Sequence, residues 1–192
     1  MPKKSSRAQW ADKIKNGTLG KSKDPAVPDF LQRGKFKGTI LGIDPSLRGT
    51  GLAVIRFADR PEGELIHSET VSPPKKAELP ECLGSIAQAV ERLIELHKPD
   101  AVAIEETIYV QNFRTAQKLG AARGAAIGQA AMKGIPVQEY PPLRIKQAVV
   151  GFGRASKEQV AGQVKALLKL SENLPFDEAD AAATALCHAW TS

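Results

Sequence analysis

Four carboxylates occupy positions from which they could form one metal-dependent active site. Two of them end apolar runs, since GTILGID closes on Asp44 and AVAIE closes on Glu105. The other two, Asp177 and Asp180, are one turn apart at the expected start of a C-terminal helix. Burial of an unpaired ion costs free energy, and carboxylates brought together from separate stretches repel one another. We therefore expect a divalent cation to hold these stretches together.

The chemistry of these side chains favours Mg²⁺, with Mn²⁺ able to substitute, because oxygen ligands suit these ions better than Zn²⁺. Two ions about 3.5–4 Å apart stabilise both the attacking and the leaving oxygen of a phosphoryl displacement. Asp177 and Asp180 can both face the cluster, because residues i and i+3 share one side of a helix. The alternative for acids at this helix start is a favourable interaction with the helix dipole, which we assign to Glu178.

The net charge of +6 conceals a strong segregation along the chain. Residues 1–37 carry ten Lys/Arg against three Asp/Glu, and residues 111–170 carry ten against two. By contrast, residues 38–110 carry seven against twelve, and residues 171–192 carry none against four. The candidate ligands thus lie in acidic stretches beside a basic block, which favours a phosphodiester substrate. For any one basic stretch alone, a solvated face without a partner is the alternative.

The composition is that of a soluble globular protein, with 192 residues, 42% hydrophobic and 25% charged. No apolar run approaches the roughly 20 residues that cross a bilayer. The N-terminal stretch MPKKSSRAQWADK lacks the apolar segment of a secretory signal. Cys82 and Cys187 have no metal-ligand spacing. We expect a reduced, cytoplasmic protein with no membrane partner.

The apolar patterning predicts three strands, followed by alternating helices and strands. The strands are expected near residues 38–44, 50–57, 63–71, 100–105 and 136–140. Short turns between the first three indicate an antiparallel meander. The helices are expected around residues 83–94, 113–133, 142–149, 156–169 and 177–190. Ser156, with Gln159 three residues later, forms a capping box for the fourth of these helices.

This order describes an α/β protein whose mixed five-stranded sheet is flanked by helices, the layout of a ribonuclease H-like fold. Such a fold brings the ends of the first and fourth strands side by side. Asp44 and Glu105 are therefore expected to meet at one edge of the sheet. We place the folded domain at residues 38–192. Residues 1–37 are Lys-rich and have no sustained apolar period, which indicates a flexible basic arm.

Five short motifs follow one another along the folded domain. They are ILGIDPSLRGTG at 40–51, AIEE at 103–106, KLGAARGAAI at 118–127, IKQAVVGFGRASKEQV at 145–160 and DEADAAATALCH at 177–188. In this order they resemble the RuvC-type Holliday junction resolvases. The resemblance implies a homodimeric, Mg²⁺-dependent endonuclease that nicks two opposed strands of a four-way DNA junction symmetrically, in recombination and repair. It also implies a partnership with the RuvA–RuvB branch-migration complex.

The resemblance assigns roles to individual residues of this RuvC-like nuclease domain. The positions of the family's four acidic catalytic and metal-binding residues are occupied by Asp44, Glu105, Asp177 and Asp180. Lys146 and Lys157 match family lysines that contact DNA near the scissile phosphate. The alternative for either lysine is an ordinary solvated side chain on a helix surface.

The sequence departs from the family pattern after both strand-end acids. Where the family usually has a glycine after Asp-Pro, this chain has Ser46, which is expected to alter the turn. Where an aromatic residue commonly wedges into the junction, this chain has Ile108, with Tyr109 next. Tyr109 is our candidate for stacking on a DNA base, since every base offers a π-face. Packing of Tyr109 within the turn is the alternative.

Three glycines, Gly120, Gly124 and Gly128, recur at every fourth position of the helix expected at 113–133. Each should cost that helix about 1 kcal/mol relative to alanine, so a close approach by another backbone would compensate. The family dimerises through this helix, and the resemblance therefore implies a homodimer interface there. Tight packing within one subunit is the alternative.

Two other functions are weighed against a resolvase. A catalytically inactive protein of the same fold would bind branched DNA without cutting, but a pure binder has no use for four acids beside phosphate. A nucleotide-dependent phosphotransferase of the actin and hexokinase type has a phosphate hairpin similar to GID-x-x-x-x-GTG. That class needs two such lobes, and 192 residues supply one.

Overall fold

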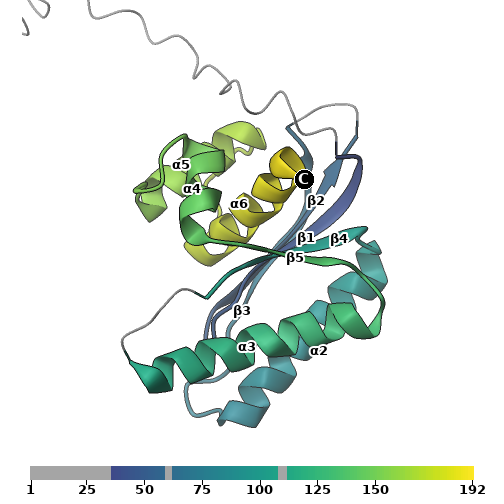
Figure 1. The fold of residues 1–192 in the computed structure, drawn as a ribbon, viewed down its shortest axis with the longest axis vertical. Coiled ribbons are helices and arrows are strands. Elements are labelled where there is room, and N and C mark those ends of the chain that lie inside the picture. Colours follow the sequence, from purple (N-terminus) through teal and green to yellow (C-terminus); the bar gives the residue numbers. More distant parts are fainter. Residues whose placement is uncertain (1–35, 59–61, 108–111) are drawn as a thin grey trace, which may run out of the picture.

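The computed structural model describes residues 36–58, 62–107 and 112–192, which form one sheet with helices on both faces (Figure 1). The strands are β1 (Gly38–Asp44), β2 (Thr50–Phe57), β3 (Glu64–Val71), β4 (Ala101–Glu105) and β5 (Val137–Tyr140). The helices are α2 (Leu79–His97), α3 (Phe113–Met132), α4 (Pro142–Val150), α5 (Lys157–Leu167) and α6 (Phe176–Thr191). These elements follow the predicted order, and their ends differ from the predicted ones by a few residues at most.

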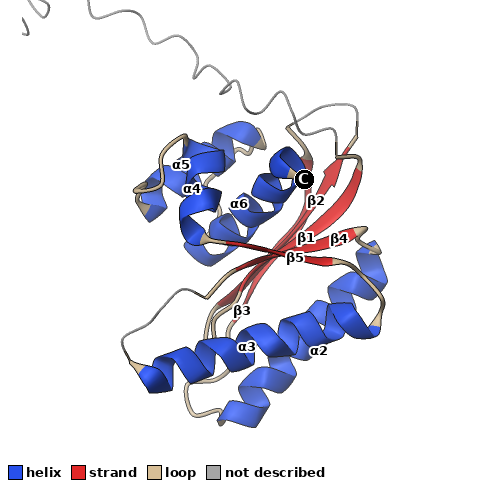
Figure 2. Cartoon of the chain, in the orientation of Figure 1, coloured by secondary structure: helices blue, strands red, loops and turns tan. Residues whose placement is uncertain are grey.

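The sheet has the strand order β3-β2-β1-β4-β5 (Figure 2). β1 pairs antiparallel with β2, and β2 with β3, which confirms the predicted meander. β4 then pairs parallel with β1, and β5 pairs parallel with β4. Ile43 of β1 lies opposite Ile104 of β4, so the next residue on each strand is a carboxylate. Asp44 and Glu105 therefore end adjacent parallel strands at the same edge, as predicted.

Two layers of helices cover the two faces of the sheet. α2 and α3 pack side by side on one face, and α4, α5 and α6 cover the other (Figure 1). Leu41 and Ile43 of β1 belong to the core under α2 and α3, whereas Ile40 belongs to the core under α6. Since side chains alternate along a strand, Asp44 and Glu105 face the α6 side.

The backbone of α6 lies unusually close to the sheet, because two facing strand positions have no side chain. A Cβ added to Gly42 would lie 2.1 Å from the backbone oxygen of Ala181. A Cβ added to Gly51 would lie 1.9 Å from the backbone oxygen of Asp177. Glycine is therefore required at both positions, and the first turn of α6 lies directly over the ends of β1 and β2.

The glycines of α3 are in a different environment. Among the described residues, no atom of another element lies within 4 Å of a Cβ added to Gly120, Gly124 or Gly128. Tight packing against another described element of the subunit therefore does not explain these glycines. Within the described ranges, none of the helices combines the length and the apolar character that a membrane crossing requires.

Candidate active site

The two strand-end carboxylates open into a cavity of about 260 Å³ at the edge of the sheet. Its lining comes from the ends of β1 and β4, the turns after them, and helices α3, α5 and α6. The lining residues are Asp44, Pro45, Ser46, Glu105, Glu106, Thr107, Leu119, Lys157 and Asp177. Three of the four predicted acids thus line one cavity, although they come from three separate stretches of sequence.

The start of α6 contributes Asp177 and also the fourth predicted acid, Asp180. Asp177 lies against the turn that follows β1, where a Cβ added to Gly49 would be 2.9 Å from its Oδ2. Gly49 thus leaves the room that the Asp177 side chain occupies. Asp180 is one turn further along α6 and is mostly buried, with 17% of its side chain exposed. The close approach of α6 to the sheet therefore brings both acids to the edge where β1 and β4 end.

Lys157 connects the two acids of α6 to α5. Its Nζ lies 3.1 Å from Asp180 Oδ2 and 4.0 Å from Asp177 Oδ1. α5 begins at Lys157, and the predicted capping box holds this start in place. Ser156 Oγ accepts from the Gln159 backbone N–H at 3.3 Å, and the Ser156 N–H donates to Gln159 Oε1 at 2.9 Å. The ammonium group is thereby placed among the carboxylates by local sequence.

The two strand-end carboxylates of the cavity, Asp44 and Glu105, hold their protons unusually strongly. The pKa of Asp44 rises to about 8, first because the carboxyl is buried and second because Glu105 and Asp180 repel its charge. Burial, and then the charge of Asp180, raise the pKa of Glu105 to about 7. Burial also raises the pKa of Asp180, although Lys157 opposes that shift. One ammonium group therefore does not neutralise the cluster.

Lys157 and Lys146 supply the positive charge next to the cluster. Burial is the largest single effect and would lower the pKa of Lys157, but the hydrogen bond to Asp180 and the charges of the surrounding aspartates together outweigh it, and its pKa is raised. Lys146, on α4, is close enough for its charge to lower the pKa values of Glu105 and Asp180. It does not line the cavity described above. Tyr109 lies outside the described residues, so its predicted role is a matter for experiment.

The donor chemistry of the cluster fits a hard divalent cation. Asp44 and Glu105 have raised pKa values, first because they are buried and second because neighbouring carboxylates repel their charge, and a cation would relieve that repulsion. Carboxylate oxygens are also the ligands that Mg²⁺ and Mn²⁺ prefer. In the part of the chain that the structure describes, no three Asp, Glu, His or Cys side chains already converge on one point as metal ligands.

The turn after Asp44 holds a residue whose role the sequence did not reveal. Arg48 donates to the backbone oxygens of Pro74 and Ala77, at 2.6 and 2.7 Å, and so ties the β1–β2 turn to the segment before α2. The Ser46 N–H donates to Thr50 Oγ1 at 3.1 Å across the same turn. Ser46 is not among the described non-glycine residues with positive φ, so this turn accommodates serine without backbone strain.

Comparison with known proteins identifies relatives along most of the chain. Residues 40–188 match the family described as crossover junction endodeoxyribonuclease RuvC. A protein of that name from Halorhodospira halophila is 47% identical over 150 residues, which cover 78% of this chain and 89% of the relative. Another of that name, from Geotalea uraniireducens, is 44% identical over 155 residues, which cover 80% of this chain and 89% of the relative.

Solved structures show the same fold. Thermus thermophilus RuvC, solved in complex with a Holliday junction substrate, is similar with a TM-score of 0.75 and 36% identity, over 80% of this chain and 93% of that one. The yeast mitochondrial Holliday junction resolvase Ydc2 has a TM-score of 0.58 over 85% of each chain. At 10% identity, Ydc2 supports the fold alone. The predicted ribonuclease H-like sheet is thus confirmed.

Proposed function

The chain belongs to the RuvC family of crossover junction endodeoxyribonucleases, and on this premise we propose that it resolves Holliday junctions at the carboxylate cluster. The observation that supports this role is the convergence of strand-end and helical acids on one edge of the sheet. Asp44 and Glu105 come from β1 and β4, and Asp177 and Asp180 come from α6. We propose that these side chains hold the divalent cation that the reaction requires, with Mg²⁺ as the metal and Mn²⁺ able to replace it.

Each side chain then has a defined task in phosphodiester hydrolysis. When bound, divalent cations generate the attacking nucleophile and stabilise the leaving oxygen of the phosphate. Asp44 and Glu105 are held by β1 and β4, so the ends of two paired strands fix one side of the site. Asp177 and Asp180 approach from α6 and complete the ligand set. Lys157 and Lys146 offset the charge that develops on the phosphate.

The decisive experiment compares a synthetic four-way junction with a linear duplex and a replication fork, each with and without Mg²⁺ or Mn²⁺. We expect paired, symmetric nicks in the junction alone, and only with a divalent cation. Asp44→Asn and Asp180→Asn should retain junction binding and lose cleavage, because the amide removes a charged metal ligand and preserves the shape of the side chain.

The matched control is Glu95→Gln on α2, an exposed acid on the other face of the sheet that pairs with Lys133. It undergoes the same change from acid to amide and should cleave like the wild type. Normal cleavage by Asp44→Asn would contradict the proposed site. Junction binding by the wild type without cleavage, under every metal condition, would favour an inactive DNA-binding protein instead.

We further propose that the protein acts as a homodimer and works with the RuvA–RuvB complex. Gly120, Gly124 and Gly128 leave part of α3 open for another backbone. Sedimentation of the wild type should give the mass of a dimer, and Gly124→Glu should give a monomer. A monomeric wild type at concentrations that support cleavage would contradict this arrangement.

Tyr109→Ala should weaken junction opening if Tyr109 stacks on a base. Residues 1–37 should add affinity for DNA of any sequence.

A further inference from the structure

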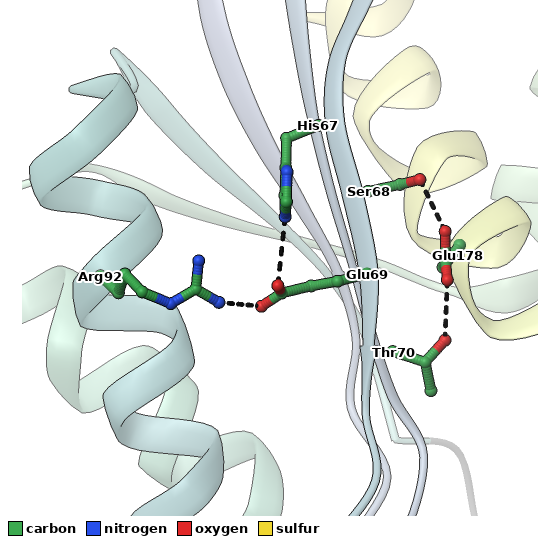
Figure 3. Close-up of polar contacts among 6 residues, drawn as sticks. All are labelled: His67, Ser68, Glu69, Thr70, Arg92 and Glu178. Atoms are coloured by element: carbon green, nitrogen blue, oxygen red, sulfur yellow. Dashed lines mark hydrogen bonds and ion pairs between the residues drawn. The ribbon is translucent and has the colours of Figure 1, made fainter.

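Glu178 lies between the two acids of α6 in sequence but takes part in a different set of contacts. Its Oε2 accepts from Ser68 Oγ at 2.6 Å, and its Oε1 accepts from Thr70 Oγ1 at 3.3 Å. Ser68 and Thr70 are alternate residues of β3, so their side chains leave the same face of the strand. Figure 3 shows both hydroxyl groups directed at the two oxygens of the Glu178 carboxylate. We name these three residues the β3 clamp.

The start of α6 has no side-chain cap, and the β3 clamp ties it to the sheet instead. The residue before the helix is Pro175, whose side chain makes no capping hydrogen bond. Without a cap, the first turn of a helix frays readily. That turn contains Asp177 and also borders Asp180, so fraying would displace two of the proposed metal ligands. The clamp attaches this turn to the sheet from a different side than Lys157.

The geometry of the helix separates the clamp from the ligands. Consecutive residues of a helix point about 100° apart, because one turn takes about 3.6 residues. Glu178 therefore points to β3 while Asp177 and Asp180, which share a side of the helix, point to Lys157. Because the two contacts lie on different sides of α6, together they resist rotation of the first turn about the helix axis.

We propose that Glu178 is a positioning residue for the metal ligands of this protein, acting through its hydrogen bonds to Ser68 and Thr70. The inference rests on the proposed function, since it assumes that Asp177 and Asp180 bind the cation. It also changes the role expected of Glu178, from a charge that complements the helix dipole to an acceptor that fixes the helix on the sheet.

The experiment compares Glu178→Ala with Glu178→Gln. Alanine removes both acceptors, whereas the Gln carboxamide can still accept from one hydroxyl and donate to the other. We expect Glu178→Ala to raise the Mg²⁺ concentration for half-maximal junction cleavage by about tenfold, the lower end of what loss of a residue supporting metal ligands costs. Glu178→Gln should remain near the wild-type value. Ser68→Ala should shift the requirement in the same direction as Glu178→Ala.

A readout without metal or DNA tests the clamp separately. In the metal-free protein, Glu178→Ala should accelerate amide hydrogen exchange in residues 176–182, and Glu178→Gln should not. Glu69→Ala is the matched control: it truncates a glutamate of the same strand whose side chain leaves the other face of β3 toward His67 and Arg92 (Figure 3). It should change neither this exchange nor the metal requirement.

Two outcomes would overturn the inference. If Glu178→Gln is as impaired as Glu178→Ala, the charge of Glu178 matters and its hydrogen bonds do not. If Glu178→Ala lowers thermal stability but leaves the metal requirement unchanged, the clamp supports the fold only. Failure of the proposed function would show itself differently, as normal cleavage by Asp44→Asn, while amide exchange would still report on the clamp.

Discussion

The two faces of the sheet are packed in different ways. Under α2 and α3 the contacts are made by large aliphatic side chains, such as Leu41 and Ile43 of β1 against Leu93 of α2. Under α6 side chains also pack, but part of the contact is between backbones, because α6 lies so close to Gly42 and Gly51 that neither position has room for a side chain. The first kind of packing keeps a helix at side-chain distance and tolerates some rearrangement. The second kind fixes the position of α6 on the sheet.

The difference coincides with the placement of the acids. Every proposed metal ligand lies on the α6 face, where the start of the helix is held by the glycine contacts, by Lys157 and by the β3 clamp. The α2 face instead has an exposed ion pair between Glu69 and Arg92. We infer that the α6 face is adapted to hold carboxylates in place and that the α2 face mainly supplies stability. The following predictions test that division.

The largest effect is expected in the pH dependence of stability without metal. The pKa of Asp44 lies at about 8 instead of 3.8, so the folded state binds its proton more strongly and loses stability as pH rises through this range. Each pKa unit corresponds to about 1.4 kcal/mol. Asp44→Asn abolishes this loss, and the variant should melt well above the wild type near pH 8. Thermal unfolding in a chelator at several pH values measures the effect.

The matched variant for this test is Glu69→Gln on the α2 face. Burial alone would raise the pKa of Glu69, but hydrogen bonds from Arg92 and His67 lower it below 4.5. Its contribution is therefore present above that pH and lost as pH falls through the lowered pKa. Glu69→Gln should melt below the wild type at neutral pH and approach it in acid. The same sign for both variants would contradict the proposed difference between the faces.

The next largest effect is expected from Leu93→Ala, which truncates a fully buried side chain of the α2 face. Large-to-small substitutions of this kind cost about 2–5 kcal/mol. Because no contact with the cavity is removed, cleavage per folded molecule and the metal requirement should stay at the wild-type level. Denaturant unfolding and cleavage assays at a temperature well below the melting point measure both quantities. A kcat that falls in parallel with stability would show that this face also positions the site.

A smaller loss of stability is expected from Gly51→Ala on the α6 face. Overpacking costs about 1–3 kcal/mol, since the new methyl group forces the backbone at Asp177 away. Here the loss of cleavage activity should be large and the loss in the free energy of unfolding small. This is the reverse of the result expected for Leu93→Ala. Gly84→Ala on α2 is the control, because no atom of another described element lies within 4 Å of its added Cβ. It should stabilise the protein by about 1 kcal/mol through helix propensity, and cleavage should not change.

Much of the architecture was predictable because it depends on local pattern. Apolar alternation and turn residues located all five strands, and the capping box at Ser156 located the start of α5. The shared edge of Asp44 and Glu105 followed from the predicted fold. The role of Glu178 was not predictable, because Ser68 and Thr70 are more than a hundred residues away in sequence. An acid in the first helical turn has a sufficient local explanation in the helix dipole.

The amino-acid sequence by itself determined the elements, their order, the acids that end the strands and the family. These follow from residue type and spacing, which local interactions and motif order express directly. Only the tertiary structure decided how α6 lies on the sheet, since that depends on Gly42 and Gly51 meeting the backbone of α6. It also decided that Lys157 and the β3 clamp hold the first turn of α6 from different sides. Such contacts join distant stretches, and no local pattern specifies them.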